Sequence, residues 1–254
     1  MIYTLLILSI YLVYTRSGEK NKRILIIVLI GCKRMIPSFS SPSPYGIFVL
    51  SGNGVLPAYL FGAIAMVTLK LEPVIHLSAE QFIQLCYTNP DAKLELTARG
   101  ELVVMSPTGE ESGMRNSWLT AQLTVWAKKD GTGVAFDSST MFQLPSGAFR
   151  SPDASLIQRS RWENLTDQQR QTFPPIAPDF VVELRSPSDS PKELQNKMQE
   201  YLDNEVRLGW LLDPMLKTVE IYRIGQPVEV LTNPTQLDGE NVLPGFVLDL
   251  GGIL

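Results

Sequence analysis

The stretch that decides the fold is Pro178-Asp179-Phe180-Val181-Val182-Glu183-Leu184-Arg185-Ser186-Pro187-Ser188. Its β-branched and aromatic residues, with proline on both sides, predict a short strand in the core of a sheet. Glu183 stands inside that strand, where an unpaired carboxylate is unfavourable. We therefore expect a bound cation, an ion pair with a neighbour such as Arg185, or solvent at the end of the strand to compensate its charge.

Charge divides the chain into two parts. Residues 1–65 contain six Lys/Arg and one acid, a net charge of +5, whereas residues 66–254 contain 16 Lys/Arg and 25 Asp/Glu, a net charge of −9. Regular patterns of helix and strand begin after Met66. We predict an apolar and basic extension over residues 1–65 and one globular domain over residues 66–254. The acidic charge of the domain disfavours tight, sequence-independent binding of nucleic acid.

Two interpretations of residues 1–65 stay open. Their apolar runs, residues 1–15 and Ile24–Cys32, fall short of the roughly 18 to 20 continuous residues that a membrane span needs. We favour translated upstream sequence, with Met66 as the physiological start, over a membrane tether. Cys32 and Cys86 have no disulfide or metal-ligand spacing, so the cytoplasm is the simplest location.

Local signals place the first elements of the domain. Ser78 and Gln81 have the spacing of a capping box and predict a helix to about Tyr87. The loop Ala98–Gly100 joins two strands, 93–97 and 101–105, into a hairpin. A second helix from about Ser112 to Lys129 carries an apolar stripe that we expect to face the core: Trp118, Leu119, Leu123, Val125 and Trp126.

Short strands dominate the rest of the chain. The predicted strands are 133–137, 140–144, 153–157, 180–185, 208–212, 218–222 and 228–231. A helical excursion is expected over 161–170, and Leu194, Met198 and Tyr201 recur at helical spacing within 191–204. That last helix lies between two strands and predicts a parallel crossover. The fold class is α/β (α+β), a mixed sheet flanked by helices.

Asp153 is the expected partner of Glu183. Asp153 and Asp179 each follow a proline at the start of a predicted strand. Asp179 and Glu183 belong to the same strand, where their backbones stand about 13 Å apart. A Mg²⁺ ion binds oxygen at about 2.1 Å, so its ligands should come from neighbouring strands. Asp153 meets this requirement, and Asp179 is interpreted as a turn residue at the start of its strand.

These residues resemble a known family. Pro152-Asp153 followed by Glu183-Leu184-Arg185 resembles the PD-(D/E)xK signature of restriction-endonuclease-like nucleases. The longer set is similar to the Uma family of endonucleases: Val182 to Ser188 with Lys197, Tyr201, Trp210 and Asp213-Pro214. The resemblance runs from about Met66 to the C-terminus and does not cover residues 1–65. The ordered set across the domain is more specific than the short signature.

The resemblance implies an endonuclease that hydrolyses DNA with Mg²⁺ or another divalent cation such as Mn²⁺. Asp153 and Glu183 would hold the metal, and the carbonyl of Leu184 would add an oxygen ligand. The implied fold is a restriction-endonuclease-like mixed sheet. DNA is the implied partner, and a homodimer is compatible with the resemblance.

The lysine of the signature is replaced in this chain. Arg185 occupies its position; arginine cannot act as a base, although it can bind a phosphate. Lys197, on the following helix, is the alternative. We hypothesise that Lys197 orients or activates the attacking water and that Arg185 holds the phosphate. The other interpretation of Lys197 is a solvated residue on the polar face of its helix.

Two further alternatives remain. Glu95 and Glu101, on the arms of the hairpin, would each supply an additional carboxylate, but we expect both to be exposed. The domain is alternatively a nuclease fold without catalysis that serves as a binding or assembly module. Arg185 and the acidic charge favour this alternative, whereas Asp153 and Glu183 favour the enzyme.

Overall fold

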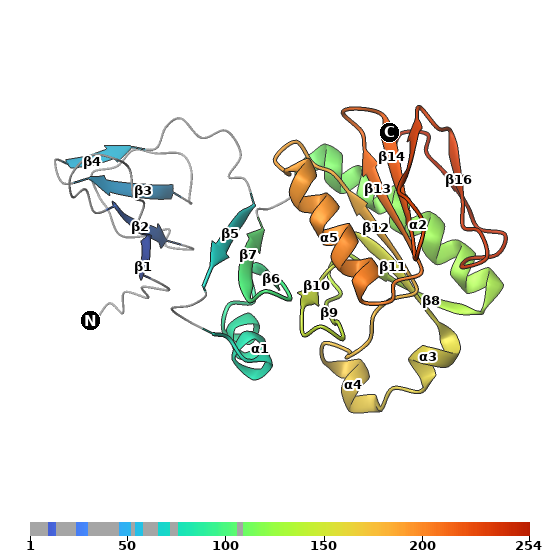
Figure 1. The fold of residues 1–254 in the computed structure, drawn as a ribbon, viewed down its shortest axis with the longest axis horizontal. Coiled ribbons are helices and arrows are strands. Elements are labelled where there is room, and N and C mark those ends of the chain that lie inside the picture. Colours follow the sequence, from blue (N-terminus) through green and yellow to red (C-terminus); the bar gives the residue numbers. More distant parts are fainter. Residues whose placement is uncertain are drawn as a thin grey trace. The chain divides into compact units, whose positions relative to one another are not determined.

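The computed structural model describes residues 66–71, 76–105 and 109–254, together with the backbone of four strands in residues 1–65. The chain divides into two compact units, Met1–Gly62 and Ala63–Leu254 (Figure 1). Strands of the first unit pair antiparallel in the order β1 (Ile10–Val13), β2 (Ile24–Leu29), β3 (Gly46–Ser51) and β4 (Gly54–Pro57). The two interpretations of residues 1–65, translated upstream sequence and a membrane tether, concern residues whose side chains the structure does not describe. Among the helices that the structure describes, none has the length and apolar character to cross a membrane.

Two main sheets build the second unit. The five-stranded sheet has the order β5-β7-β6-β10-β9 and the six-stranded sheet the order β15-β14-β13-β12-β11-β8. The strands of the first are β5 (Val67–Lys70), β6 (Lys93–Leu96), β7 (Glu101–Met105), β9 (Phe142–Gln143) and β10 (Phe149–Arg150). Those of the second are β8 (Gly133–Asp137), β11 (Ala154–Gln158), β12 (Phe180–Leu184), β13 (Leu208–Asp213), β14 (Thr218–Arg223) and β15 (Glu229–Thr232). A separate hairpin consists of β16 (Gln236–Asp238) and β17 (Val247–Asp249).

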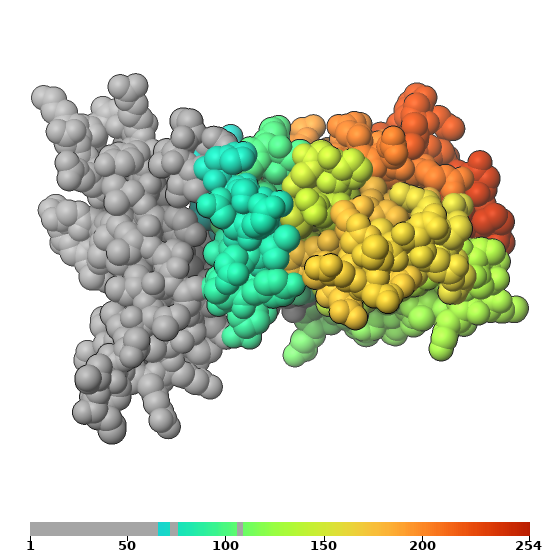
Figure 2. All heavy atoms as spheres, turned by 90° about the horizontal axis from the view of Figure 1, so that it is seen from below, coloured from blue at the N-terminus to red at the C-terminus, as the bar shows by residue number. Residues whose placement is uncertain are grey.

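The predicted mixed sheet and its crossover are confirmed. Strand β12 pairs parallel with β13 and antiparallel with β11. The helices are α1 (Ala79–Thr88), α2 (Glu110–Asp130), α3 (Arg159–Glu163), α4 (Asp167–Gln171) and α5 (Pro191–Asp203). Helix α5 connects β12 to β13, and α1 begins at the expected capping box of Ser78 and Gln81. The excursion between β11 and β12 forms α3 and α4, seen in yellow on the surface in Figure 2.

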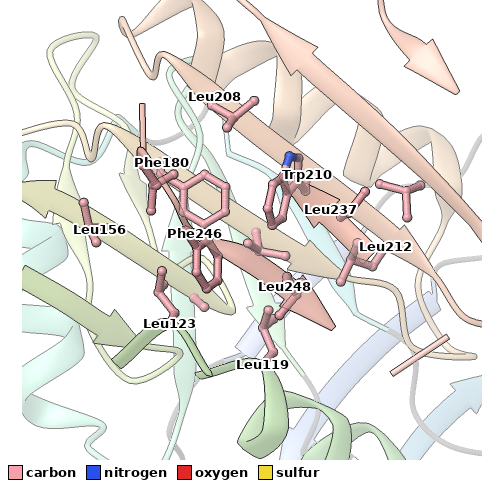
Figure 3. Packing of buried hydrophobic residues seen from close by; sticks show 14 of the residues in the cluster. Leu119, Leu123, Leu156, Phe180, Leu208, Trp210, Leu212, Leu237, Phe246 and Leu248 are labelled. Atoms are coloured by element: carbon pink, nitrogen blue, oxygen red, sulfur yellow. The ribbon is translucent and has the colours of Figure 1, made fainter. Parts of the chain in front are cut away.

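One face of the six-stranded sheet packs against α2 and the β16–β17 hairpin. Phe180, Trp210 and Phe246 meet there, with centroids 4.8 Å apart for Phe180–Trp210 and 6.1 Å apart for Trp210–Phe246 (Figure 3). Leu119 and Leu123 of α2 are buried in this cluster, as predicted.

The expected core stripe of α2 was wrong at two positions. Trp118 is 43% exposed and Val125 is 68% exposed. Residues of a helix are separated by about 100°, so these two side chains lie well away from the direction of Leu119 and Leu123. The stripe that faces the sheet is therefore narrower than the apolar stripe in the sequence.

The opposite face of the sheet packs against α5, which lies in front of it in Figure 1. Leu194, Met198 and Tyr201 of α5 are buried in this second cluster. Gly209 of β13 makes the close approach possible, because a Cβ at this position would lie 2.5 Å from Cε of Met198. A third cluster joins α1 to the five-stranded sheet, with Phe82 and Phe149 in ring contact. The chain passes from one sheet to the other through residues 151–153, between β10 and β11.

Candidate functional site

Strand register places Asp153 beside Glu183. Ala154, at the start of β11, lies opposite Val182 of β12; Asp153 directly precedes Ala154, and Glu183 directly follows Val182. The Asp153 carboxylate is near enough to Glu183 for its charge to raise the pKa of Glu183. Oδ2 of Asp153 also accepts a hydrogen bond from the backbone N–H of Leu184 at 2.8 Å. The structure thus brings together the two carboxylates that the sequence indicated as a pair.

Helix α5 delivers Lys197 to this pair. Its Nζ lies 2.8 Å from Oε1 of Glu183 and 2.9 Å from Oε1 of Glu95, and it donates to the carbonyl oxygen of Ser151 at 3.2 Å. An ammonium has three donors, and these three contacts use them all. Lys197 is 8% exposed, so its interpretation as a solvated residue was wrong. The helical period places it on the same side of α5 as Tyr201, which also faces the sheet.

Glu95 was expected to be exposed, and it is 1% exposed. Nη1 of Arg150 donates to its Oε2 at 2.9 Å, and the backbone N–H of Ser151 donates to its Oε1 at 2.9 Å. Its surroundings are the pairing of β6 with β10 and two contacts from α5, Lys197 with Glu95 and Glu200 with Arg150. Glu101, on the other arm of the hairpin, pairs with Arg99 instead.

Sequence reasoning missed the residues that surround these carboxylates. Oε2 of Glu200 accepts from Nε of Arg150, and its Oε1 accepts from the backbone N–H of Ala98 at 2.9 Å. The hydroxyl of Tyr201 donates to Oε1 of Glu183 at 2.9 Å. The sequence did contain a signal for these contacts. Glu95 stands between two leucines, which indicates burial, and Arg150 directly precedes the segment Ser151–Asp153.

The site carries more acids than bases. Four acids, Glu95, Asp153, Glu183 and Glu200, stand against two bases, Arg150 and Lys197, so the fully ionised cluster would carry a charge of 2 − 4 = −2. This excess of negative charge favours an additional cation.

The pKa shifts follow from burial and from the neighbouring charges. The pKa of Glu183 is raised to about 8: burial is the largest cause, Lys197 opposes it, and the carboxylates of Asp153 and Glu95 add to the rise. Burial also raises the pKa of Asp153. At Glu95 burial acts in the same direction, but Lys197 and Arg150 together outweigh it and lower the pKa. Burial disfavours the charged form of Lys197, yet the two glutamates raise its pKa above the usual range.

The donor set fits a hard divalent cation. No three His, Cys, Asp or Glu side chains of the described residues form a group that could hold a metal by itself. Mg²⁺ does not require such a group, because it keeps several waters and is usually bound through one or two carboxylates. Asp153 and Glu183 would provide those two carboxylates, and the excess of negative charge would favour the ion.

Arg185 contacts other residues. Strand β12 ends at Leu184, and Nη1 of Arg185 lies 2.6 Å from Oδ2 of Asp213, at the end of β13. Its Nε donates to the carbonyl oxygen of Asp189 at 3.4 Å. Alternation along a longer strand would place Arg185 on the same face as Glu183, but β12 ends before Arg185 and the alternation does not extend to it.

Asp179 lies just before β12, where the sequence placed it. It is 2% exposed, accepts a hydrogen bond from the backbone N–H of Gln158 at 2.8 Å, and pairs with Arg161 at 2.9 Å. These contacts tie the start of β12 to β11 and to α3, which is a structural role.

A groove gives access to one side of the site. It has a volume of about 340 Å³ and lies between α5 and strands β5, β6 and β7. Its charged lining includes both signs: Lys70, Arg99, Arg150 and Lys197, and Glu95, Glu101, Glu193 and Glu200. The groove therefore reaches the part of the site around Glu95 and Lys197, whereas Glu183 and Asp153 do not line it.

The chain is similar to known proteins in fold and in sequence. The structure is similar to the crystal structure of "a putative nuclease belonging to DUF820" from Anabaena variabilis, with a TM-score of 0.59 and 21% sequence identity. The similarity covers 70% of this chain and 97% of that chain, and it confirms the predicted nuclease fold.

Residues 79–251 match the family Uma2, described as "Putative restriction endonuclease". The chain belongs to this family, as the sequence predicted. No curated protein matched the sequence.

Proposed function

We propose that the chain is a metal-dependent endonuclease that hydrolyses phosphodiester bonds of DNA. The observation that carries the proposal is the contact of Lys197 with Glu183, which itself lies beside Asp153. Two acids on neighbouring strands and one lysine are the residue types of the PD-(D/E)xK signature. In this chain the lysine comes from α5 instead of from position 185. Membership of the family described as "Putative restriction endonuclease" supports the same function.

The residues of the site take distinct roles in the proposal. Asp153 and Glu183 would hold Mg²⁺ or Mn²⁺, and the carbonyl of Leu184 would add an oxygen ligand. A divalent cation bound there would neutralise charge that develops on the phosphate and lower the pKa of a bound water. Lys197 would orient the attacking water by exchanging its hydrogen bond to the carbonyl oxygen of Ser151 for one to the water. Because the two glutamates raise its pKa, we assign it to act as a charged donor instead of a base.

Arg185 is the proposed phosphate ligand. Its pairing with Asp213 does not exclude this role, because a guanidinium carries five N–H donors in a fork that suits phosphate oxygens. Arg150 has a different role: it holds Glu95 and Glu200 together in the lining of the groove.

The test is cleavage of a panel of single- and double-stranded DNA with Mg²⁺, with Mn²⁺ and with a chelator. We expect the wild type to cleave only with metal. Asp153→Asn and Lys197→Met should each lower the rate at least about a hundredfold, since each removes a group that acts in the transition state. Lys192→Met, on the exposed side of α5, is the matched control. A wild type that cleaves no member of the panel with either metal would favour the binding module instead.

A further inference from the structure

Asn116 of α2 contacts the Asp153 carboxylate. Its Nδ2 donates to Oδ1 of Asp153 at 2.8 Å. The other carboxylate oxygen accepts from the backbone N–H of Leu184 at 2.8 Å. Each carboxylate oxygen of Asp153 therefore accepts one hydrogen bond. The two donors belong to different elements, α2 and the end of β12. This arrangement fixes the orientation of the carboxylate.

The second polar atom of Asn116 lacks a partner. Oδ1 is buried and accepts no hydrogen bond within the part of the chain that the structure describes. The reverse orientation of the amide would direct this oxygen at the carboxylate and lose the bond to Asp153, so Asp153 sets the orientation. Oxygen and nitrogen of an amide are about 2.2 Å apart, which keeps Oδ1 within roughly 5 Å of the Asp153 carboxylate. Buried acceptors without a donor are few in native proteins, and such an atom beside a metal ligand indicates a polar group bound there.

We propose that Asn116 is a positioning residue of the metal site: Nδ2 holds the Asp153 carboxylate, and Oδ1 accepts a hydrogen bond from a water in the hydration shell of the cation. The inference rests on the proposed function and extends its site to α2. Mg²⁺ usually keeps several waters, which act as donors. A neutral amide supplies an acceptor to these waters without adding charge to a cluster that already has an excess of acids.

Metal affinity tests this role, because a purely structural contact would not change it. We would titrate Mn²⁺ into wild type, Asn116→Leu and Gln122→Leu and follow binding by calorimetry. Partners of metal ligands typically change affinity by about 10- to 100-fold, and we expect a loss in that range for Asn116→Leu. Gln122 is the matched control, an amide of the same helix that donates to and accepts from the backbone of Asp249. Its replacement should leave the affinity unchanged. Asn116→Ala replaces the leucine variant if the latter does not fold.

The outcomes separate this inference from the proposed function. Wild-type affinity in Asn116→Leu, together with lost binding in Asp153→Asn, would overturn the inference and leave the metal ligand in place. Wild-type affinity in both variants would instead remove Asp153 from the ligand set and overturn the role of Asn116 with it. A wild type that binds no Mn²⁺ would overturn both proposals.

Discussion

The ammonium of Lys197 lies 2.8 Å from Oε1 of Glu183 and 2.9 Å from Oε1 of Glu95. One lysine on α5 thus pairs with two buried carboxylates that belong to different sheets. The contact has a structural consequence, because it holds the five-stranded and six-stranded sheets to the same helix. It also places a charged donor beside the acids that we propose to bind the metal.

Lys197→Met should destabilise the protein. Removal of the ammonium leaves Glu95 and Glu183 buried without their common partner, and a broken buried ion pair typically lowers the free energy of unfolding by about 3–5 kcal/mol. Urea denaturation measures this change, and the exposed Lys192→Met should stay near wild type. Equal stability of the two variants would show that the contact contributes little to the fold.

Asp153→Asn and Glu183→Gln should each abolish Mg²⁺ binding with little loss of stability, since a cluster of crowded acids is expected to be strained. Calorimetric titration compares the affinities, and thermal melting compares the stabilities. Asp179→Asn is the control: it should keep Mg²⁺ affinity and lose stability, because Asp179 pairs with Arg161 away from the site. Unchanged affinity in both site variants would exclude this pair as the ligands.

Metal affinity should depend on pH in one direction. Burial raises the pKa of Glu183 to about 8, so below that pH a proton occupies the carboxyl that the metal needs. The apparent affinity for Mn²⁺ should therefore rise by about tenfold per pH unit between pH 6 and 8 and level off above. Calorimetry in buffers of different ionisation enthalpy should detect about one proton released at pH 7. An affinity that is constant from pH 6 to 8 would contradict the raised pKa.

Arg185→Met should weaken DNA binding and leave Mg²⁺ affinity unchanged, because we propose that the guanidinium holds the phosphate and not the metal. Asp213→Asn removes the charge of its partner but keeps the guanidinium. Fluorescence anisotropy with labelled DNA compares the two variants. An equal loss of DNA binding in both variants would contradict the phosphate role of Arg185. It would indicate that Arg185 affects DNA binding only through its ion pair with Asp213.

Residues 66–254 should fold alone, with a cooperative thermal transition. This segment contains every strand of the two main sheets and all five helices that the structure describes. Circular dichroism would compare its melting with that of the full chain. If residues 66–254 alone were insoluble, or melted without cooperativity while the full chain remained stable, residues 1–65 would be required for the fold of the domain.

Local signals in the sequence predicted most elements of the domain. The capping box at Ser78, the hairpin around Gly100 and the strand that ends at Leu184 are each encoded within a few residues. The pairing of Asp153 with Glu183 followed from the length of a strand, since Asp179 lies too far along it to share a cation. The parallel crossover followed from a helix between two buried strands.

Tertiary structure alone decided the rest of the site. Glu95 is buried where β6 pairs with β10, whose residues lie more than fifty positions away in the chain, and where Lys197 of α5 contacts its carboxylate. In the sequence Lys197 is a charged residue on an amphipathic helix. Only the tertiary structure shows that its ammonium group lies between two acids. Hydrophobic period and turn chemistry act over short windows of sequence, whereas the burial of a charge depends on which distant groups surround it.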